Sequence, residues 1–322
     1  MSVNHMENKE LVELLKSRNM NFTYPQRAEE TLRTVSYYKI KEFAAPFNKI
    51  VDGKIDYQGE FFEKILSRYY QDKNLRISLL HAIEDIEVAL QTQIAFVLGS
   101  VEGNGYTYLD FSKWCNKNEY CKHYLKLKQN NFRRDLFKAL KRGKSEEIKQ
   151  KIKAENNNLP TIWLAVDLLT FGQLVMILEL MSTSNLIKIS SQYNCSNDEL
   201  ISWLKTVNLL RNICAHNNNI IDIKLKTMPI LKDEWKLFIL KTGDNMYSNR
   251  VSVPIVLIKY LLDKINPKYN YSEISSAMIK LIDGNEKNAK YYGFSNEKVI
   301  YSIFPKAKYR NRKRNYSNRR VK

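Results

Sequence analysis

The sequence predicts an all-α protein, and three observations support this fold class. The 322 residues include only 10 Gly and 7 Pro, too few for the many turns of a strand-rich architecture. One long stretch carries apolar residues at spacings of three and four, the period of an amphipathic helix. Two other stretches contain the Ser/Thr and Glu/Gln pairs that cap helix N-termini. The periodic stretch contains Leu79, Ile83, Ile86, Leu90, Ile94 and Val97.

The N-terminal third is expected to form helices joined by one tight turn. Thr23 and Gln26 have the spacing of a capping box, and Pro25 between them suits an early helical position. Asp52-Gly53 predicts a turn or a short hairpin within residues 51–59. The expected helices are residues 7–16, 23–46, 60–70 and 75–98.

The middle of the chain alternates between charged and apolar helical patterns. Residues 103–106 mark a loop, and 111–153 form a charged helical region broken near Gly143. Residues 160–181 read as one helix that is apolar nearly all round, and therefore central to the core. The charged region offers a phosphate-facing surface or, equally, a plain solvated face. Its basic residues are Lys126, Lys128, Arg133, Arg134, Lys138, Lys141 and Arg142.

The C-terminal third is expected to add further helices. Ser196 and Glu199 form a second capping box, which starts a helix through Trp203 and Leu210. No strand is expected beyond the pair within 51–57. The remaining helices are predicted over residues 233–241, 254–264, 272–281 and 296–304.

The chain is strongly basic, with a formal net charge of +18. Such a charge predicts a polyanionic partner, with nucleic acid ahead of membrane, although a bias toward Lys, Asn, Ile and Tyr is the alternative explanation. A basic tail, 305–322, is expected to be disordered when free and to order on RNA, with Tyr309 and Tyr316 stacking on bases. A nonspecific solubilising tail is the other interpretation. The tail residues expected to bind RNA are Lys306, Lys308, Arg310, Arg312, Lys313, Arg314, Arg319 and Arg320.

The cysteines and the apolar stretches predict a reduced, cytoplasmic protein without metal or cofactor. The four cysteines form no CxxC pair, and Cys115, Cys121 and His123 lack a fourth partner for a metal. The N-terminus has no apolar core typical of a signal peptide. Residues 162–181 contain two acidic residues and a glutamine, too polar a composition to span a bilayer.

A polar cluster follows the apolar helical pattern that begins at Trp203. Arg211 and Asn212 are followed by His216 and then by Asn217, Asn218 and Asn219. At about 100° per residue, Asn212 and His216 share a helix face, whereas Arg211 and His216 lie about 140° apart. The two can converge through the length of the arginine, or if the helix ends near Ala215. The asparagines favour such an end, because Asn tolerates the left-handed conformation common there.

Arginine and histidine on a basic protein suit metal-independent RNA cleavage. The sequence has no Gly-rich phosphate loop, no carboxylate cluster for two metals and no plausible Ser/His/Asp arrangement. RNA carries its own nucleophile, the 2′-OH, so an enzyme need only move protons and stabilise the charged phosphorane. Arg211 would hold the phosphate oxygens and His216 would act as general acid or base. A two-fold dimer would supply the second histidine that the two proton transfers require.

Glu87 lies beside the apolar stripe of residues 79–97, four residues after Ile83. A carboxylate near a core face needs a cationic or hydrogen-bonding partner, because burying it alone costs several kcal/mol. One hypothesis is that Glu87 orients Arg211 or the polar group around it. The alternative is a half-exposed glutamate at the edge of the stripe.

Four blocks of this sequence resemble the Abi-like abortive-infection proteins of the AbiD/AbiF type, a branch of the HEPN superfamily. The most specific block is LRNICAHNNNI, because Arg-(four residues)-His is the HEPN ribonuclease signature and Asn-x-x-Ala fills it in this branch. Together the blocks cover about residues 10–225. They are SYYKIKEFAAPF (36–47), LRISLLHAIEDIEVALQTQIAF (75–96), LPTIWLAVDLLTFGQLVMIL (159–178) and LRNICAHNNNI (210–220).

The resemblance implies a HEPN-type helical bundle over 1–225, followed by a helical extension over 226–304 and the tail. It implies a homodimer whose Arg211 and His216 form a composite RNase site, with Asn212 as a supporting polar residue. Apart from the resemblance, Glu87 and Asn217 are expected to support this site. Phage defence through RNA cleavage and a small structured RNA that restrains the toxin also follow from it. Many members have a basic residue soon after the histidine, where this chain has asparagines. Substrate binding there must therefore differ or come from elsewhere, and the basic tail is a candidate. A non-catalytic RNA-binding or sensor protein, or a partner-protein adaptor, are the alternatives.

Overall fold

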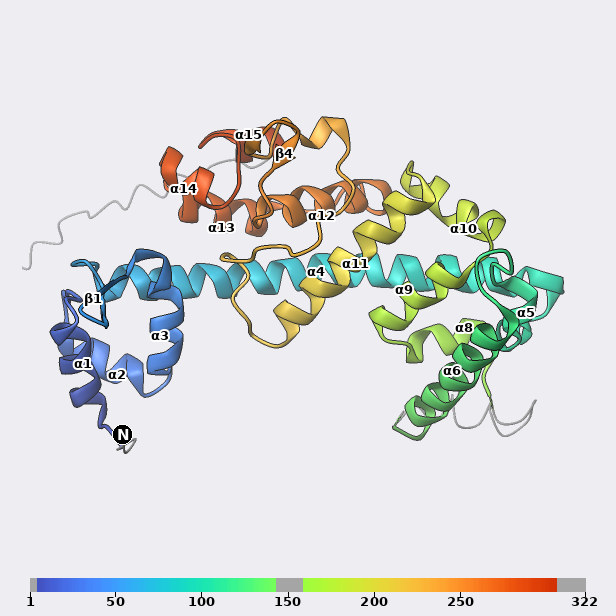
Figure 1. Ribbon diagram of the computed structural model, residues 1–322, viewed down its shortest axis with the longest axis horizontal. Helices are drawn as coiled ribbons and strands as arrows, with labels where there is room; N and C mark the ends of the chain where they lie inside the picture. Colours follow the sequence, from blue (N-terminus) through green and yellow to red (C-terminus); the bar gives the residue numbers. More distant parts are fainter. Residues whose placement is uncertain (1–4, 143–158, 306–322) are drawn as a thin grey trace, which may run out of the picture. The chain divides into compact units, whose positions relative to one another are not determined.

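The computed structural model describes residues 5–142 and 159–305, and it is all-α apart from two short hairpins (Figure 1). The described residues divide into two compact units. The first unit contains residues 5–75, 270–290 and 296–305, and the second contains 76–142, 159–269 and 291–295. The domain limits expected at 225 and 304 follow a different division and stay a prediction. No helix in the described ranges is long and apolar enough to cross a membrane.

The first unit begins with three short helices where the sequence predicted two. The expected helix over 23–46 is interrupted after Leu32, because the Ser36 hydroxyl accepts a hydrogen bond from the backbone N–H of Lys39 at 3.3 Å and starts a new helix. The predicted capping box at Thr23 is not formed; its backbone N–H instead donates to Glu63 Oε1 at 3.0 Å. The helices wholly in this unit are α1 (Asn8–Ser17), α2 (Pro25–Leu32), α3 (Tyr37–Ala44), α13 (Ser272–Ile282) and α15 (Val299–Ile303).

The predicted turn at Asp52-Gly53 is confirmed as a two-residue hairpin. Strands β1 (Lys49–Val51) and β2 (Lys54–Asp56) pair antiparallel. Asp52 has φ 47° and Gly53 has φ 71°, so both central residues are left-handed, as this hairpin turn requires.

Residues 62–99 form one continuous helix, α4 (Phe62–Gly99), where two helices were predicted over 60–70 and 75–98. The segment 71–74 between them contains neither Gly nor Pro, and Asp72 within it is fully buried, so the helix continues through it. The apolar stripe of residues 79–97 is confirmed. Each of its six members is at most 1% exposed: Leu79, Ile83, Ile86, Leu90, Ile94 and Val97.

The second unit is built from the C-terminal part of α4 and the helices of the middle of the chain. The predicted helix over 160–181 is divided at Thr170, which forms a capping box with Gln173 and starts α9. Its apolar character is confirmed as core. The other helices here are α5 (Phe111–Trp114), α6 (Lys122–Arg142), α8 (Ile162–Ala165), α9 (Phe171–Leu180), α10 (Thr183–Ser190), α11 (Asn197–Ala215) and α12 (Ser252–Ile265). The break predicted near Gly143 lies outside the described residues.

Short 3-10 segments join these elements. In the first unit η1 (Ala45–Phe47) follows α3. The predicted loop at 103–106 is confirmed, and Gly103 there has φ 63°. The 3-10 segments of the second unit are η2 (Val101–Gly103), η3 (Thr107–Leu109), η5 (Val166–Leu168), η6 (Ser191–Tyr193) and η7 (Asp233–Trp235).

The helix predicted over 233–241 is wrong. Only η7 is helical there, and the chain then forms the hairpin of β3 (Lys241–Gly243) and β4 (Met246–Tyr247). Asn245 at the turn has φ 56°, a conformation that Asn tolerates and that ends a helix. The helices predicted at 254–264, 272–281 and 296–304 are confirmed as α12, α13 and α15. Helices α10 and α14 (Glu286–Tyr291) were not predicted.

Candidate functional site

Helix α11 carries the predicted site at its C-terminal end, and its N-terminal end is firmly capped. The predicted capping box is confirmed: the Ser196 N–H donates to Glu199 Oε2 at 2.8 Å, and the Glu199 N–H donates to Ser196 Oγ at 3.1 Å. One face of the helix is buried against the core. Its buried residues are Leu200, Trp203, Leu204, Thr206, Val207, Leu210 and Cys214.

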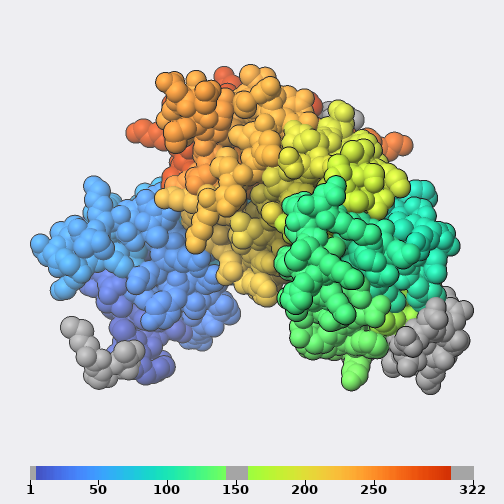
Figure 2. All heavy atoms as spheres, turned by 45° about the vertical axis from the view of Figure 1, so that its right-hand side comes forward, coloured from blue at the N-terminus to red at the C-terminus, as the bar shows by residue number. Residues whose placement is uncertain are grey.

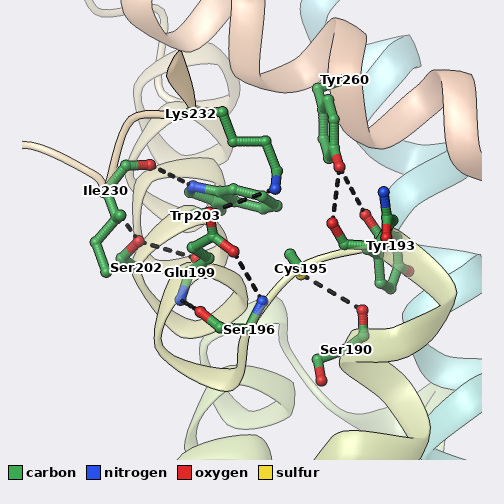
Figure 3. Close-up of polar contacts among 11 residues, drawn as sticks. Ser190, Tyr193, Cys195, Ser196, Glu199, Ser202, Trp203, Ile230, Lys232 and Tyr260 are labelled. Atoms are coloured by element: carbon green, nitrogen blue, oxygen red, sulfur yellow. Dashed lines mark hydrogen bonds and ion pairs between the residues drawn. The ribbon is translucent and has the colours of Figure 1, made fainter. Parts of the chain in front are cut away.

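The segment that follows the site is held back against α11 by an aromatic cluster (Figure 3). Trp203 Nε1 donates to the carbonyl of Ile230 at 2.7 Å. The ammonium of Lys232 lies 5.5 Å from the ring centre of Trp203 and 5.4 Å from that of Tyr260, and it pairs with Glu199 at 3.4 Å. These contacts fix the segment around Ile230 and Lys232 against α11.

The C-terminal end of α11 has the hydrogen bonds of a Schellman motif. His216 is the C-cap, with φ −97° and ψ 15°. The next residue, Asn217, has φ 56°, and its N–H donates to the carbonyl of Cys214 at 3.4 Å. The N–H of Asn218 donates to the carbonyl of Ile213 at 3.0 Å. The prediction that asparagines end this helix through a left-handed residue is thus confirmed.

Asn217 also ties the end of α11 to α4. Its Oδ1 accepts a hydrogen bond from Arg76 Nη1 at 2.9 Å, across 141 residues of sequence. Arg76 is only 4% exposed. Because a hydrogen bond from a buried cation is costly to lose, this contact fixes the backbone directly after His216. Figure 1 shows α11 crossing α4.

Two substitutions at Asn217 separate its backbone role from its side-chain role. Asn217→Gly keeps the left-handed conformation and loses the side chain that accepts the bond from Arg76. Asn217→Ala also loses that bond. In addition, the alanine Cβ is strained in the left-handed conformation at φ 56°, which costs about 1 kcal/mol more. We expect the free energy of unfolding, measured by chemical denaturation, to fall further for Asn217→Ala than for Asn217→Gly. Equal losses would contradict a helix end that depends on the left-handed residue.

Glu87 and Arg211 influence each other electrostatically. Burial raises the pKa of the Glu87 carboxyl, attraction from Arg211 lowers it, and repulsion from Glu84 raises it. Burial is the largest of these effects, so the net pKa is above the ordinary value. In the described part of the chain no hydrogen bond or ion pair joins Glu87 to Arg211. The hypothesis that Glu87 orients Arg211 therefore stays a prediction, supported by their attraction.

Arg211 lies in the last turns of α11, and His216 follows the last helical residue, Ala215. Helical spacing sets the two residues about 140° apart, and the helix end at Ala215 is one of the two conditions under which their side chains can converge. Asn212 and His216 are exposed and Arg211 is half-buried. Within the described residues, neither Arg211 nor His216 forms a side-chain hydrogen bond with the rest of the chain. Arg211 and His216 therefore stay candidate site residues at the end of α11.

A comparison with protein families identifies the chain. The model of the Abi-like protein family matches residues 30–222, which is more than half of the sequence. The match includes all of α11 and the asparagines that follow His216. The chain belongs to the Abi-like protein family. It is therefore an abortive-infection-related protein. No curated protein and no solved structure gave a significant match.

In this Abi-like protein the residues after His216 form a second polar network. Asn219 Nδ2 donates to Asp222 Oδ2 at 2.6 Å, and the hydroxyl of Tyr291 donates to Asp222 Oδ1 at 2.7 Å. The guanidinium of Arg250 lies 4.8 Å from the ring centre of Tyr291. The side chains of Asn217 and Asn219 thus have structural roles, which account for their polarity without any contact to a substrate.

Sequence reasoning missed Arg76, Asp222 and Tyr291. Arg76 carried one signal, because it lies three residues before Leu79 and so on the buried side of the helix, where a cation needs a partner. Asp222 and Tyr291 are brought together only by the fold. The basic tail residues that were expected to bind RNA, Lys306 to Arg320, lie outside the described residues.

Proposed function

We propose that this Abi-like protein is a metal-independent endoribonuclease of the HEPN type, acting as the toxin-like component of a bacterial abortive-infection system in the cytoplasm. The observation that supports this most is the end of α11. There Asn212 and His216 are exposed beside the half-buried Arg211, on a helix end held by the Schellman motif and by Arg76. Such an end is rigid enough to hold reacting groups in place.

The chemistry uses the 2′-OH of the substrate as nucleophile. A histidine takes the 2′-OH proton while the 2′ oxygen forms a bond to phosphorus, and a second proton donor protonates the 5′ oxygen as its bond to phosphorus breaks. Arg211 stabilises the negative charge on the non-bridging phosphate oxygens. The products are a 2′,3′-cyclic phosphate and a 5′-hydroxyl. Asn212, on the same helix face as His216, supports the phosphate by hydrogen bonding.

A homodimer supplies the second proton-transfer group. One chain offers only His216 at this helix end, and Arg211 lies on another side of the helix, so a second copy is needed to complete the site. Two exposed apolar side chains on α4, one of them next to Glu87, support self-association in this region. Val88 is 60% exposed and Phe96, two helical turns further along α4, is 72% exposed.

The alternative is an RNA-binding or sensor protein that holds phosphate without cutting it. The separation of Arg211 and His216 within one chain favours this alternative if the protein acts as a monomer. A small structured RNA that restrains the toxin fits either function, because it would occupy the same phosphate-binding groups.

The test is incubation of the purified protein with labelled RNA in the presence of EDTA. We expect cleavage to continue, and the fragments to carry 2′,3′-cyclic phosphate and 5′-hydroxyl ends, which are resolved by ligation and phosphatase treatment. Fragments with 5′-phosphate ends would indicate an attacking water instead of the 2′-OH and would contradict the mechanism. RNA that is bound but intact after long incubation would favour the sensor function.

A further inference from the structure

A groove of 1220 Å³ runs along one side of α11. Leu209 and Ile213 of α11 form part of its wall, and the returning segment 223–228, with Lys224 and Lys226, forms another part. At about 100° per residue, Leu209, Ile213 and His216 lie within about 60° of one another around the helix. The groove and His216 therefore occupy the same side of α11.

A pair of tyrosines extends this groove toward α6. Tyr120 lines the groove and stacks on Tyr124, with ring centres 5.4 Å apart and planes 19° apart. Tyr124 is 36% exposed, and the ammonium of Lys128 lies 5.2 Å from its ring centre. Parallel aromatic rings next to a cation are the surface on which unpaired nucleic-acid bases stack.

Helix α6 carries a high density of positive charge. Its 21 residues contain eight Lys and Arg against one acid, Asp135, a net charge of +7. Asp135 lies 3.6 Å from Arg134 and from Lys138, and all three side chains are largely exposed, so these pairs are weak. Tyr124, Lys128 and Lys138 lie within about 80° around the helix. Figure 2 shows α6 as the green surface facing the viewer.

The distribution of charge separates the two parts of this surface. Lys205, Lys224 and Lys226 line the groove, but Glu119, Glu179 and Asp198 do so too, and Lys205 pairs with Glu179 at 2.6 Å. The groove is therefore close to neutral, with apolar walls that suit bases. The excess charge on α6 suits phosphates. If α6 were only a solvated helix face, its positive charge would have no reason to lie beside the stacked Tyr120 and Tyr124, which lead into the groove.

We propose that single-stranded RNA lies along an RNA track made by Lys224, Lys226, Tyr120, Tyr124, Lys128 and Lys138. Its bases occupy the groove and stack on the tyrosines, and its phosphates follow α6. The inference rests on the proposed function in one respect, because RNA is taken as the polyanion that His216 acts on. It assigns to the body of the protein the substrate grip that the asparagines after His216 do not provide.

The test measures binding separately from cleavage. Full-length protein carrying His216→Ala is titrated against a fluorescein-labelled 12-nucleotide oligouridine, and the dissociation constant is obtained from anisotropy at several salt concentrations. Adding Tyr124→Ala is expected to weaken binding by about fivefold or more through lost stacking, while Tyr124→Phe, which keeps the ring, leaves it unchanged. Melting temperatures of both variants check that the fold is retained.

The charge contribution has its own matched pair. Lys128→Gln with Lys138→Gln is expected to lower the slope of log affinity against log salt by about 1.4, which is two phosphate contacts on a single strand. Lys280→Gln with Lys298→Gln removes the same charge from exposed positions of the first unit and should leave the slope unchanged. Equal effects of the two double variants, or of Tyr124→Ala and Tyr124→Phe, would overturn the track. If the wild-type protein cleaves no RNA but this binding pattern holds, the proposed catalysis fails and the track stands.

Discussion

His216→Ala is expected to lower the rate of RNA cleavage by about 10²–10⁴-fold, the usual contribution of a positioned general acid or base. The side chain is exposed, and the residue contributes its backbone N–H to the carbonyl of Asn212 at 3.0 Å, a bond that alanine also makes. The helix end therefore keeps its geometry in the variant. The measurement is the single-turnover rate on labelled RNA, together with growth after induced expression, which should be normal for the variant.

Two comparisons make this result specific to proton transfer at this position. His216→Gln retains a polar side chain without a group that titrates near neutral pH, so it should be as inactive as the alanine variant. His81→Ala removes another exposed histidine of the second unit, whose ring nitrogen lies 2.9 Å from the hydroxyl of Tyr269, and should cleave at the parental rate. A fully active His216→Ala protein, or equal toxicity of variant and parent, would end the assignment of His216.

The sequence was sufficient to predict the structure around His216 because its signals there are local. Ser196 and Glu199 cap the helix through contacts three residues apart, and an asparagine in the left-handed conformation ends it. Both devices depend on neighbouring residues alone. The same holds for the turn at Asp52-Gly53. These elements appear in the structure as they were predicted.

Other boundaries could not be read because an apolar pattern hides them. Thr170 and Gln173 have the spacing of a capping box, yet they lie inside a stretch of mostly apolar residues. Such a stretch shows no periodicity from which a helix boundary could be predicted. Residues 71–74 show the opposite error. They were left between two predicted helices, but the fold buries Asp72 and the helix continues. A local cap decided the first case, and tertiary burial accounts for the second.

The candidate site residues can be proposed from the sequence, but the contacts that support them cannot. Arg211, Asn212 and His216 belong to one short segment, whereas the contact between Arg76 and Asn217 joins residues 141 apart. Asn217 was predicted as a supporting residue, and the structure gives it a role in ending the helix. A single sequence does not specify which cationic side chain will donate to the Asn217 amide. It also does not specify how two copies of the chain would pack in a dimer.

If the proposed dimer shares one active site between its chains, replacing His216 in only one chain should reduce the cleavage rate by much more than half. In a mixed dimer of one parental chain and one His216→Ala chain, only one histidine remains for two proton transfers. We expect its cleavage rate to fall below about a tenth of the parental dimer, since each proton-transfer group contributes about 10²-fold or more. If each chain carried a complete site, the rate would be one half.

The mixed dimer is obtained by co-expressing the two chains with different affinity tags and purifying through both tags. A mixed dimer with His81→Ala in one chain is the matched control and should retain the full rate. The reason to expect a shared site is geometric. Helical spacing sets Arg211 and His216 about 140° apart, and the Schellman motif and Arg76 fix the end of the helix, so within one chain only the length of the arginine side chain can bring both groups to one phosphate. A second copy can present its own group to that phosphate directly. A rate of one half, or cleavage by a protein that sedimentation shows to be monomeric, would mean that Arg211 reaches the phosphate within its own chain, and the dimer would then have no part in catalysis.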